Sequence, residues 1–245
     1  DMMAVYSQTN VGIYIDALAV SGFANELSLT ATADELDFTT FASGGWRQKR
    51  AGLANYMADV KGFQDYATTG VDPAFPVSGL GGSSTITVAP TGGTAVADPA
   101  FFGSGVLTQY MPLTGAVGEL AKFDFGWAGS AQLVRGQMLH PVAARTATGN
   151  GTTTTFTTPT ATQALYASFH VQSVSGTGSI VFTVQTDDNS GMTTPTTRLT
   201  SATFTGVGAG TASLAGALAG ETHIRVVYTI TGFTSVTFAV AAGVL

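Results

Sequence analysis

Apolar and polar residues alternate one by one along much of this chain, and this pattern constrains its fold more than any other feature. In residues 25–32, Leu27, Leu29 and Ala31 fall on one side and polar residues fall on the other. Successive side chains of a β-strand point to opposite faces, whereas an amphipathic helix repeats every 3.6 residues. Helical periodicity is nearly absent, so the sequence predicts an all-β protein.

The same alternation predicts a series of further strands. In residues 119–128, Phe123, Phe125 and Trp127 alternate with smaller or charged residues, as on a half-buried sheet. The glycine of the following Ala128-Gly129-Ser130 allows a tight turn into the next strand. The other predicted strands are residues 36–40, 56–63, 131–140, 165–174, 179–186, 198–204, 223–231 and 235–240.

Residues 68–104 interrupt this pattern with four prolines and many glycines. Proline is excluded from central strands, so we predict a long connection in which only residues 85–89 form a short strand. Its apolar residues argue against disorder and favour ordering against a partner. The candidate contact residues are Val71, Phe75, Leu80, Phe101 and Phe102.

The chain is predicted to have two β domains. Residues 1–145 form the first domain, which includes the long loop 68–104. Residues 146–160 are rich in threonine and glycine and are interpreted as a linker or an extended edge. Residues 161–245 show the strand spacing of a C-terminal β-sandwich lobe, either Ig-like or jelly-roll-like.

Charge is sparse: charged residues make up 10% of the chain and the net charge is −6, against about 25% charged residues in an ordinary soluble domain. Two explanations stay open, namely burial of much of the surface against copies of the chain and a neutral, threonine-covered monomer. The one basic run, residues 47–50, is too small for specific nucleic-acid binding.

The chain contains no cysteine, which excludes disulfides and thiolate metal sites. No apolar run approaches the roughly 20 residues that span a bilayer, and the first residues do not resemble a signal peptide. We therefore expect no membrane association, and synthesis in the cytoplasm. No cofactor is expected.

Sequence motifs of catalysis and metal binding are also absent, including the serine nucleophile elbow, the phosphate-binding loop and the zinc-binding HExxH. His140, His170 and His223 follow no ligand spacing. The acidic residues 34–37 could in principle supply carboxylates for glycosidic cleavage, but a solvated turn is the plainer interpretation. Residues 187–191 only faintly resemble a calcium loop and favour a turn. We expect no enzyme activity, no catalytic residue and no metal site.

Residues 26–66 resemble the tail tube (major tail) proteins of bacteriophages with long non-contractile tails. In that family a strand of the type sLsxsxdxlDxTtF leads through a short basic segment into GLxxxxxxxxGFxD. The residues of this chain that match the pattern are Leu27, Leu29, Asp34, Leu36, Asp37, Thr39, Thr40, Phe41, Arg50, Gly52, Leu53, Gly62, Phe63 and Asp65. A weaker likeness links the C-terminal region to β-sandwich lobes of virion proteins.

The resemblance implies a virion structural protein with a tail-tube-type β-sandwich or barrel domain. Six copies would join their sheets into a ring, and rings would stack into the tube that conducts DNA during ejection without binding it specifically. Tape measure and terminator proteins would be further partners. The loop 68–104 would contact the neighbouring ring. Acids facing the lumen would repel DNA, and the candidates are Glu26, Glu119 and Asp124.

Three alternatives remain. The first is another virion subunit, a tail terminator or a capsid decoration protein. The second is a carbohydrate-binding module, which would need a row of exposed aromatic residues on the C-terminal lobe. The third is a glycoside hydrolase, which would need two carboxylates facing each other across a cleft.

Overall fold

The computed structural model describes residues 9–67, 70–75, 79–156, 159–160, 162–216, 218 and 220–245. Antiparallel strands dominate it, and the expected all-β class is confirmed. The elements in chain order are β1 (Gly12–Ile15), β2 (Leu18–Ala19), a 3-10 turn η1 (Val20–Gly22), β3 (Ala24–Asp37), β4 (Lys49–Phe63), α1 (Val71–Ala74), β5 (Ser83–Ala89), β6 (Pro99–Thr114), β7 (Lys122–Gly129), β8 (Val134–Arg145), β9 (Gly149–Asn150), β10 (Thr154–Thr155), β11 (Leu165–Ser175), β12 (Ser179–Asp187), β13 (Thr196–Thr200), β14 (Gly208–Leu214), β15 (His223–Thr231) and β16 (Ser235–Val244). Neither helix in the described part of the chain is long and apolar enough to cross a bilayer.

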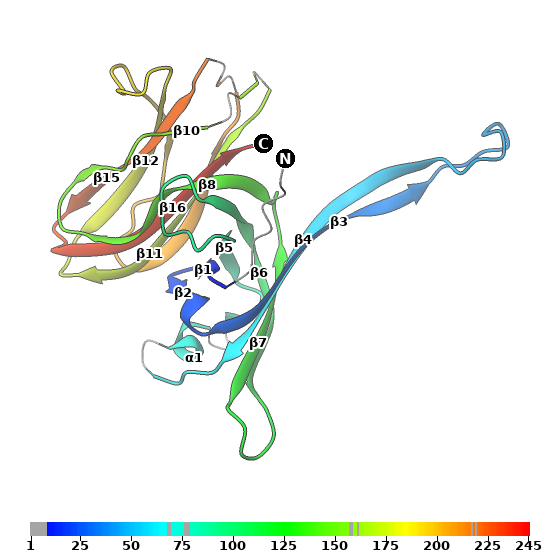
Figure 1. Ribbon diagram of the computed structural model, residues 1–245, viewed down its shortest axis with the longest axis horizontal. Coiled ribbons are helices and arrows are strands. Elements are labelled where there is room, and N and C mark those ends of the chain that lie inside the picture. The colour runs from blue at the N-terminus through cyan, green and yellow to red at the C-terminus, as the bar shows by residue number, and fades with distance from the viewer. Residues whose placement is uncertain are drawn as a thin grey trace.

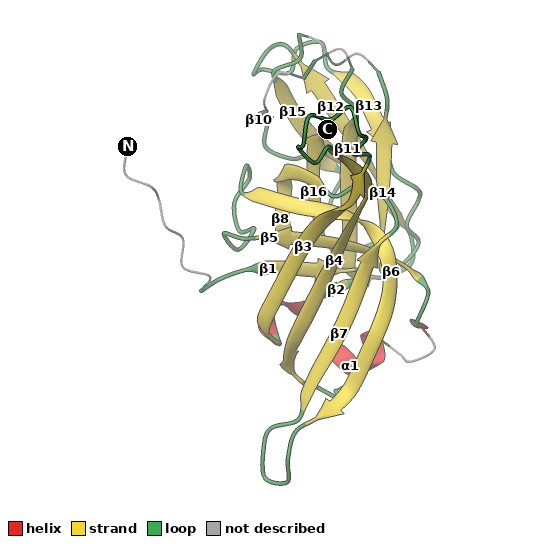
Figure 2. Cartoon of the chain, turned by 90° about the vertical axis from the view of Figure 1, so that its right-hand side faces the viewer, coloured by secondary structure: helices red, strands yellow, loops and turns green. Residues whose placement is uncertain are grey.

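Two sheets build the molecule (Figures 1 and 2). The larger runs β14-β11-β16-β8-β6-β5-β1-β2, and it branches at β6, where β7, β4 and β3 are added in turn. The smaller runs β10-β15-β12-β13, with β9 also on β15. Because β16 from the C-terminal region pairs with β8 and β8 pairs with β6, one sheet is shared by both halves of the chain.

The branch in the larger sheet follows from the 16-residue length of β6. Its first part pairs with β8 up to Phe102, and its later part pairs with β7 from Gly105 onward. A Cβ atom on Gly105 would lie 2.1 Å from the carbonyl oxygen of Ala128 and 2.5 Å from the Trp127 ring. Glycine therefore lets the two strands approach closely where the sheet divides.

Two main cores stabilise the fold. One lies between the two sheets of the C-terminal sandwich and contains Phe169, Phe182 and Phe238. The other lies beneath β4, β6 and β7 and contains Trp127 and Phe125. A smaller third cluster joins strands from both halves of the chain.

The prediction of a long connection at residues 68–104 is wrong where the structure has α1 and the start of β6. That segment holds α1, all of β5 and the start of β6, and β5 pairs with both β1 and β6. The expected strand at 85–89 is present as Ser83–Ala89 and its side chains are mostly buried. Pro73 lies within α1 and Pro99 begins β6, so these prolines punctuate short elements.

Residues 146–160, interpreted as a linker or an extended edge, contain β9 and β10. Both short strands pair with β15 of the smaller sheet. These two strands therefore lie at the smaller sheet of the C-terminal sandwich.

Candidate assembly surfaces

The most conspicuous surface is a β-hairpin that projects from the body of the molecule (Figure 1). We call its outer part, residues 30–55, the arm. Within the arm, β3 and β4 pair with each other from Thr32–Asn55 to Asp37–Lys49. No residue between 30 and 55 belongs to a hydrophobic core cluster, and almost all are exposed. The arm is thus a two-stranded ribbon with solvent on both faces.

Large apolar side chains of the arm are exposed. The exposed fraction is 113% for Phe41, 82% for Trp46 and 81% for Leu53. The guanidinium of Arg50 lies 5.6 Å from the centroid of the Phe38 ring. An isolated two-stranded hairpin is at best marginally stable in water, and clustered exposed apolar residues mark interaction sites. The arm therefore has the properties of a segment that binds a partner.

Below the arm, four strands in the order β3-β4-β7-β6 form a subsheet with two free edges. In the described chain β3 pairs only with β4, and the later half of β6 pairs only with β7. Free edges offer unpaired backbone N–H and C=O groups to another chain. The β3 edge can consequently be extended, whereas the β6 edge is partly occupied, because the carbonyl oxygens of Leu107 and Pro112 accept hydrogen bonds from the Gly81 N–H at 2.8 Å and the Tyr66 hydroxyl at 3.0 Å.

One face of this subsheet carries a row of charges. Glu26 is in register with Lys61, and Lys61 is in register with Asp124, so the three side chains share a face across β3, β4 and β7. The Lys61 Nζ atom lies 2.9 Å from Glu26 Oε1, and its hydrogen bond to Glu26 raises the pKa of Lys61. Asp59 is two residues before Lys61 in β4, so its side chain lies on the same face. Asp59 was not selected in the sequence analysis, and the alternation of β4 was the one signal that could have indicated it.

The structure brings together only two of the three acidic residues that we predicted to face the lumen of a tube. Glu26 and Asp124 lie in the same row. Glu119 lies in the β6–β7 loop instead, where its carboxylate accepts a hydrogen bond from the backbone N–H of Ala116 at 3.3 Å.

The predicted contact residues occupy different environments. Val71, Phe75 and Phe102 are buried in the cores of this chain, and the Phe75 ring lies 5.1 Å from that of Phe125. Phe101 is half-buried, and Leu80 is 41% exposed. Because the first three fill the interior of their own subunit, they present no surface to a neighbouring copy in this fold.

The acidic residues 34–37, which the sequence analysis considered as possible catalytic carboxylates, do not form a catalytic site. Asp34, Glu35 and Asp37 lie on the exposed arm, where Glu35 forms an ion pair with Lys49, and they do not face a second carboxylate across a cleft. Within the described residues no group of three histidine, aspartate or glutamate side chains could hold a metal ion.

The histidines have structural surroundings. His170 is fully buried, with Nδ1 2.8 Å from the Asp16 carbonyl oxygen and Nε2 2.8 Å from Thr87 Oγ1. His140 accepts a hydrogen bond from Arg145 Nε at 3.0 Å. Burial lowers the pKa of each ring to about 4, so both are neutral at pH 7.

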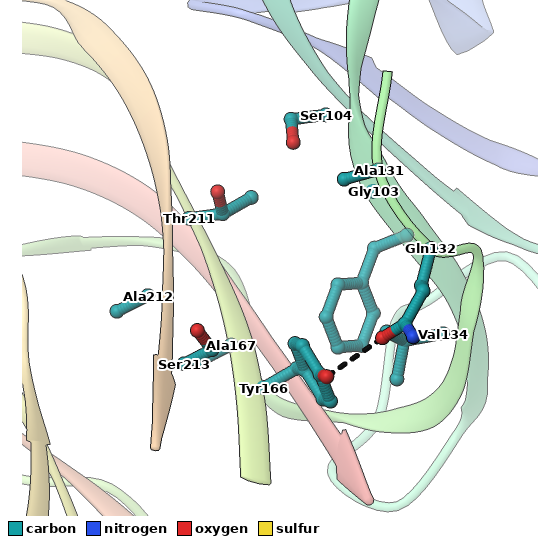
Figure 3. Close-up of a pocket in the computed structure, with 11 residues that line it drawn as sticks. Gly103, Ser104, Ala131, Gln132, Val134, Tyr166, Ala167, Thr211, Ala212 and Ser213 are labelled. Atoms are coloured by element: carbon teal, nitrogen blue, oxygen red, sulfur yellow. Dashed lines mark hydrogen bonds between the residues drawn. The ribbon is translucent and has the colours of Figure 1, made fainter. Parts of the chain in front are cut away.

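Two hollows lie near the junction of the halves. A pocket of about 470 Å³ lies between β6, β11 and β14, and at its rim the Tyr166 hydroxyl donates a hydrogen bond to Gln132 Oε1 at 2.7 Å (Figure 3). Small residues line it together with Phe102 and Tyr166, and no histidine or carboxylate side chain is among them to activate a hydroxyl. The second hollow, here called the root groove, is an apolar groove of about 680 Å³ where the arm leaves the body.

The C-terminal sandwich offers no aromatic platform in the part that the structure describes. The large apolar side chains exposed on residues 165–245 are those of Val207 and Leu245. A sugar-binding face would need exposed aromatic rings, so this lobe does not support a carbohydrate-binding module.

Comparisons with known proteins identify loose structural likenesses. No protein-family model matches the chain, and no curated protein sequence matches it. A chain of the virion of a native gene transfer agent (GTA) particle is 15% identical, with a TM-score of 0.42 over 53% of this chain and 97% of that one. A chain of the tail of an empty GTA particle with C6 symmetry is 18% identical, with a TM-score of 0.39 over 49% and 91%.

A third structure is the SPP1 Dit protein, described as a paradigm of the hub adsorption apparatus of phages that infect Gram-positive bacteria. It is 11% identical, with a TM-score of 0.34 over 96% of this chain and 99% of that one. At these TM-scores and identities we draw no functional conclusion from the likenesses.

Proposed function

We propose that this protein is a structural subunit of a phage tail, and that its copies assemble into rings that stack to form the tail tube. It acts by self-association, without an enzymatic step. DNA passes through the tube during ejection without specific binding, and the tape measure and terminator proteins are the other expected partners.

The observation that carries this proposal is the arm. Residues 30–55 contribute nothing to the cores of their own subunit, yet they expose Phe41, Trp46 and Leu53. Strand pairing, one ion pair and one cation–π contact hold the ribbon together, and such an isolated hairpin is at best marginally stable. Burial against another copy supplies the missing stability.

The resemblance to tail tube proteins supports the same element. The stretch that carries it, residues 26–66, covers nearly all of β3, the tip of the arm and all of β4. The residues that form the projecting hairpin are thus those whose pattern matches the family.

The free edges of the subsheet provide a way to close a ring. If the β3 edge of one copy pairs with the free half of β6 in the next, each copy is both donor and acceptor, and a closed ring leaves no edge exposed. The resemblance implies six copies. The low charge of the chain then follows, because edges and ring faces become buried.

The charged face of the subsheet becomes the wall of the channel in this proposal. Glu26, Asp59 and Asp124 outnumber Lys61 and Lys122 on that face. A weakly acidic wall repels phosphates and lets DNA slide.

Shortening the arm tests the proposal. Residues 34–53 are replaced by Asn-Gly, which joins Ala33 to Ala54, a pair that is in register in the hairpin. Because none of the removed residues contributes to a core, the variant should fold and show the circular dichroism of the wild type. It should remain monomeric in sedimentation, whereas the wild type forms rings or tubes.

Val207→Ser is the matched control, because it removes an apolar side chain that is 58% exposed on the other lobe. This variant should assemble like the wild type. Normal tubes from the arm-shortened variant would refute the role of the arm.

A further inference from the structure

The loop between β6 and β7 is an exposed apolar knob at one end of the subsheet. We define the knob as residues 113–120. The exposed fractions are 68% for Leu113, 107% for Val117 and 69% for Leu120. The loop projects from the lower end of the molecule in Figures 1 and 2, and Glu119 is its one charged residue.

The root groove lies at the other end of the same strands. Its floor includes Ala31, Ala33 and Ala54, which lie on the same face of the hairpin as Tyr56. Leu133 and Leu245 contribute apolar walls, and none of the side chains that line it is charged. The small side chains of its floor leave a volume of about 680 Å³ open to incoming aliphatic groups.

The knob and the root groove of one chain cannot meet. Lys122, where β7 begins after the knob, is in register with Phe63 at the end of β4. Ala54 lies nine residues before Phe63 on the same strand, which corresponds to about 30 Å. Each copy therefore presents one apolar projection and one apolar groove at opposite ends of a rigid strand pair.

We propose that the knob of one copy inserts into the root groove of a copy in the next ring, and that this contact stacks the rings. The inference rests on the proposed function and specifies its axial interface. Two different surfaces of the same chain meet, so the contact is heterologous and, when it does not close on itself, it propagates without limit. A tube needs an axial contact of this type.

The small size of the contact indicates that it acts only between rings. Three aliphatic side chains in one groove bury much less than the roughly 1,000 Å² that a stable pairwise interface needs. Single subunits would not stack end to end through it. A ring repeats the contact once per copy, and this multivalency makes ring-to-ring association strong.

A charge exchange tests the proposed pairing in the full-length chain. Val117→Lys places a charge on the knob, and Ala131→Glu, at a groove residue outside the arm, places one in the groove. Because both positions are exposed, neither change disturbs folding. Each single variant should give isolated rings and at least tenfold fewer stacked rings in electron micrographs, and the double variant should restore tubes.

Cysteine cross-linking provides a second measurement, since the natural chain contains no cysteine. In the variant Val117→Cys with Ala131→Cys, a bond within one chain is impossible, because the knob and the groove lie about 30 Å apart and the Cα atoms of a disulfide lie within about 7 Å. Oxidation of tubes should give a ladder of covalent oligomers on a non-reducing gel. The single cysteine variants should give no ladder, and Val207→Cys with Val117→Cys is the control pair.

The outcomes separate this inference from the function on which it rests. Tubes from the single charge variants, or an absence of the ladder in wild-type-like tubes, would refute the knob-and-groove contact and leave ring assembly intact. If the wild-type chain forms no rings at all, the proposed function fails and the inference fails with it.

Discussion

Acid should destabilise this fold well above the range in which carboxylates titrate, because two buried histidines must remain neutral. The Asp16 carbonyl oxygen fixes the proton of His170 on Nδ1, and the Thr87 hydroxyl donates to Nε2. In the native state, burial lowers the pKa of His170 to about 4. In the unfolded chain it returns to its ordinary value of about 6.5.

The sign follows from these two values. Between pH 6.5 and 4 the unfolded chain binds a proton that the native chain does not, so stability is complete above pH 6.5 and is lost as the pH falls. At pH 5 the difference amounts to about 2 kcal/mol for His170. A similar loss is expected from His140, whose pKa is also lowered to about 4 by burial and by the Arg145 charge.

The assay is urea unfolding of the full-length chain at pH 7.5 and pH 5.0, with His170→Gln as the test variant. Glutamine cannot titrate, so the variant should lose about 2 kcal/mol less than the wild type over this interval, whatever its stability at pH 7.5. Measurements at two protein concentrations control for assembly. An identical pH dependence in wild type and variant would refute the assignment of the pH effect to His170.

Two further predictions concern packing. Phe182→Ala should reduce the free energy of unfolding by about 3–5 kcal/mol, because this fully buried ring contacts Phe169, Phe204 and Phe238. Urea unfolding measures the change, and a loss below about 1 kcal/mol would show that this core is loosely packed. Gly62→Ala should give little folded protein, since its Cβ would lie 2.1 Å from the Phe23 carbonyl oxygen, and a normal near-ultraviolet circular dichroism spectrum would contradict that.

The sequence could predict the strands whose side chains alternate clearly. The expected strand at residues 223–231 matches β15, and the expected strand at 165–174 differs from β11 by one residue. β14 was missed because Gly208–Leu214 consists of small residues without apolar alternation. All of β6 was missed, because Pro99 and Pro112, with the glycines between them, are as typical of a loop as of a strand.

The candidate surfaces were harder to predict than the strands. The side chains of Val71, Phe75 and Phe102 are apolar because they fill a core, and composition alone cannot tell a core from an interface. The arm shows the reverse case. Its alternation is that of a half-buried strand, and only the tertiary structure shows that residues 30–37, whose backbone pairs with β4, leave their side chains exposed.

The position of the charged row depends on strand register. Glu26 and Asp124 are 98 residues apart in the sequence, and they are brought together because Lys61 of β4 pairs with both. Alternation alone assigns each residue to a face of its strand. It does not say which strands are neighbours.

Electron microscopy of the purified full-length protein tests the central claim most directly. Self-assembly through the arm and the two free edges predicts rings, alone or stacked into tubes, with a central channel walled by β3, β4, β7 and β6. The distance between stacked rings should match the length of the subsheet between the knob and the root groove. A protein that stays monomeric at every concentration, with the arm free in solution, would contradict the account.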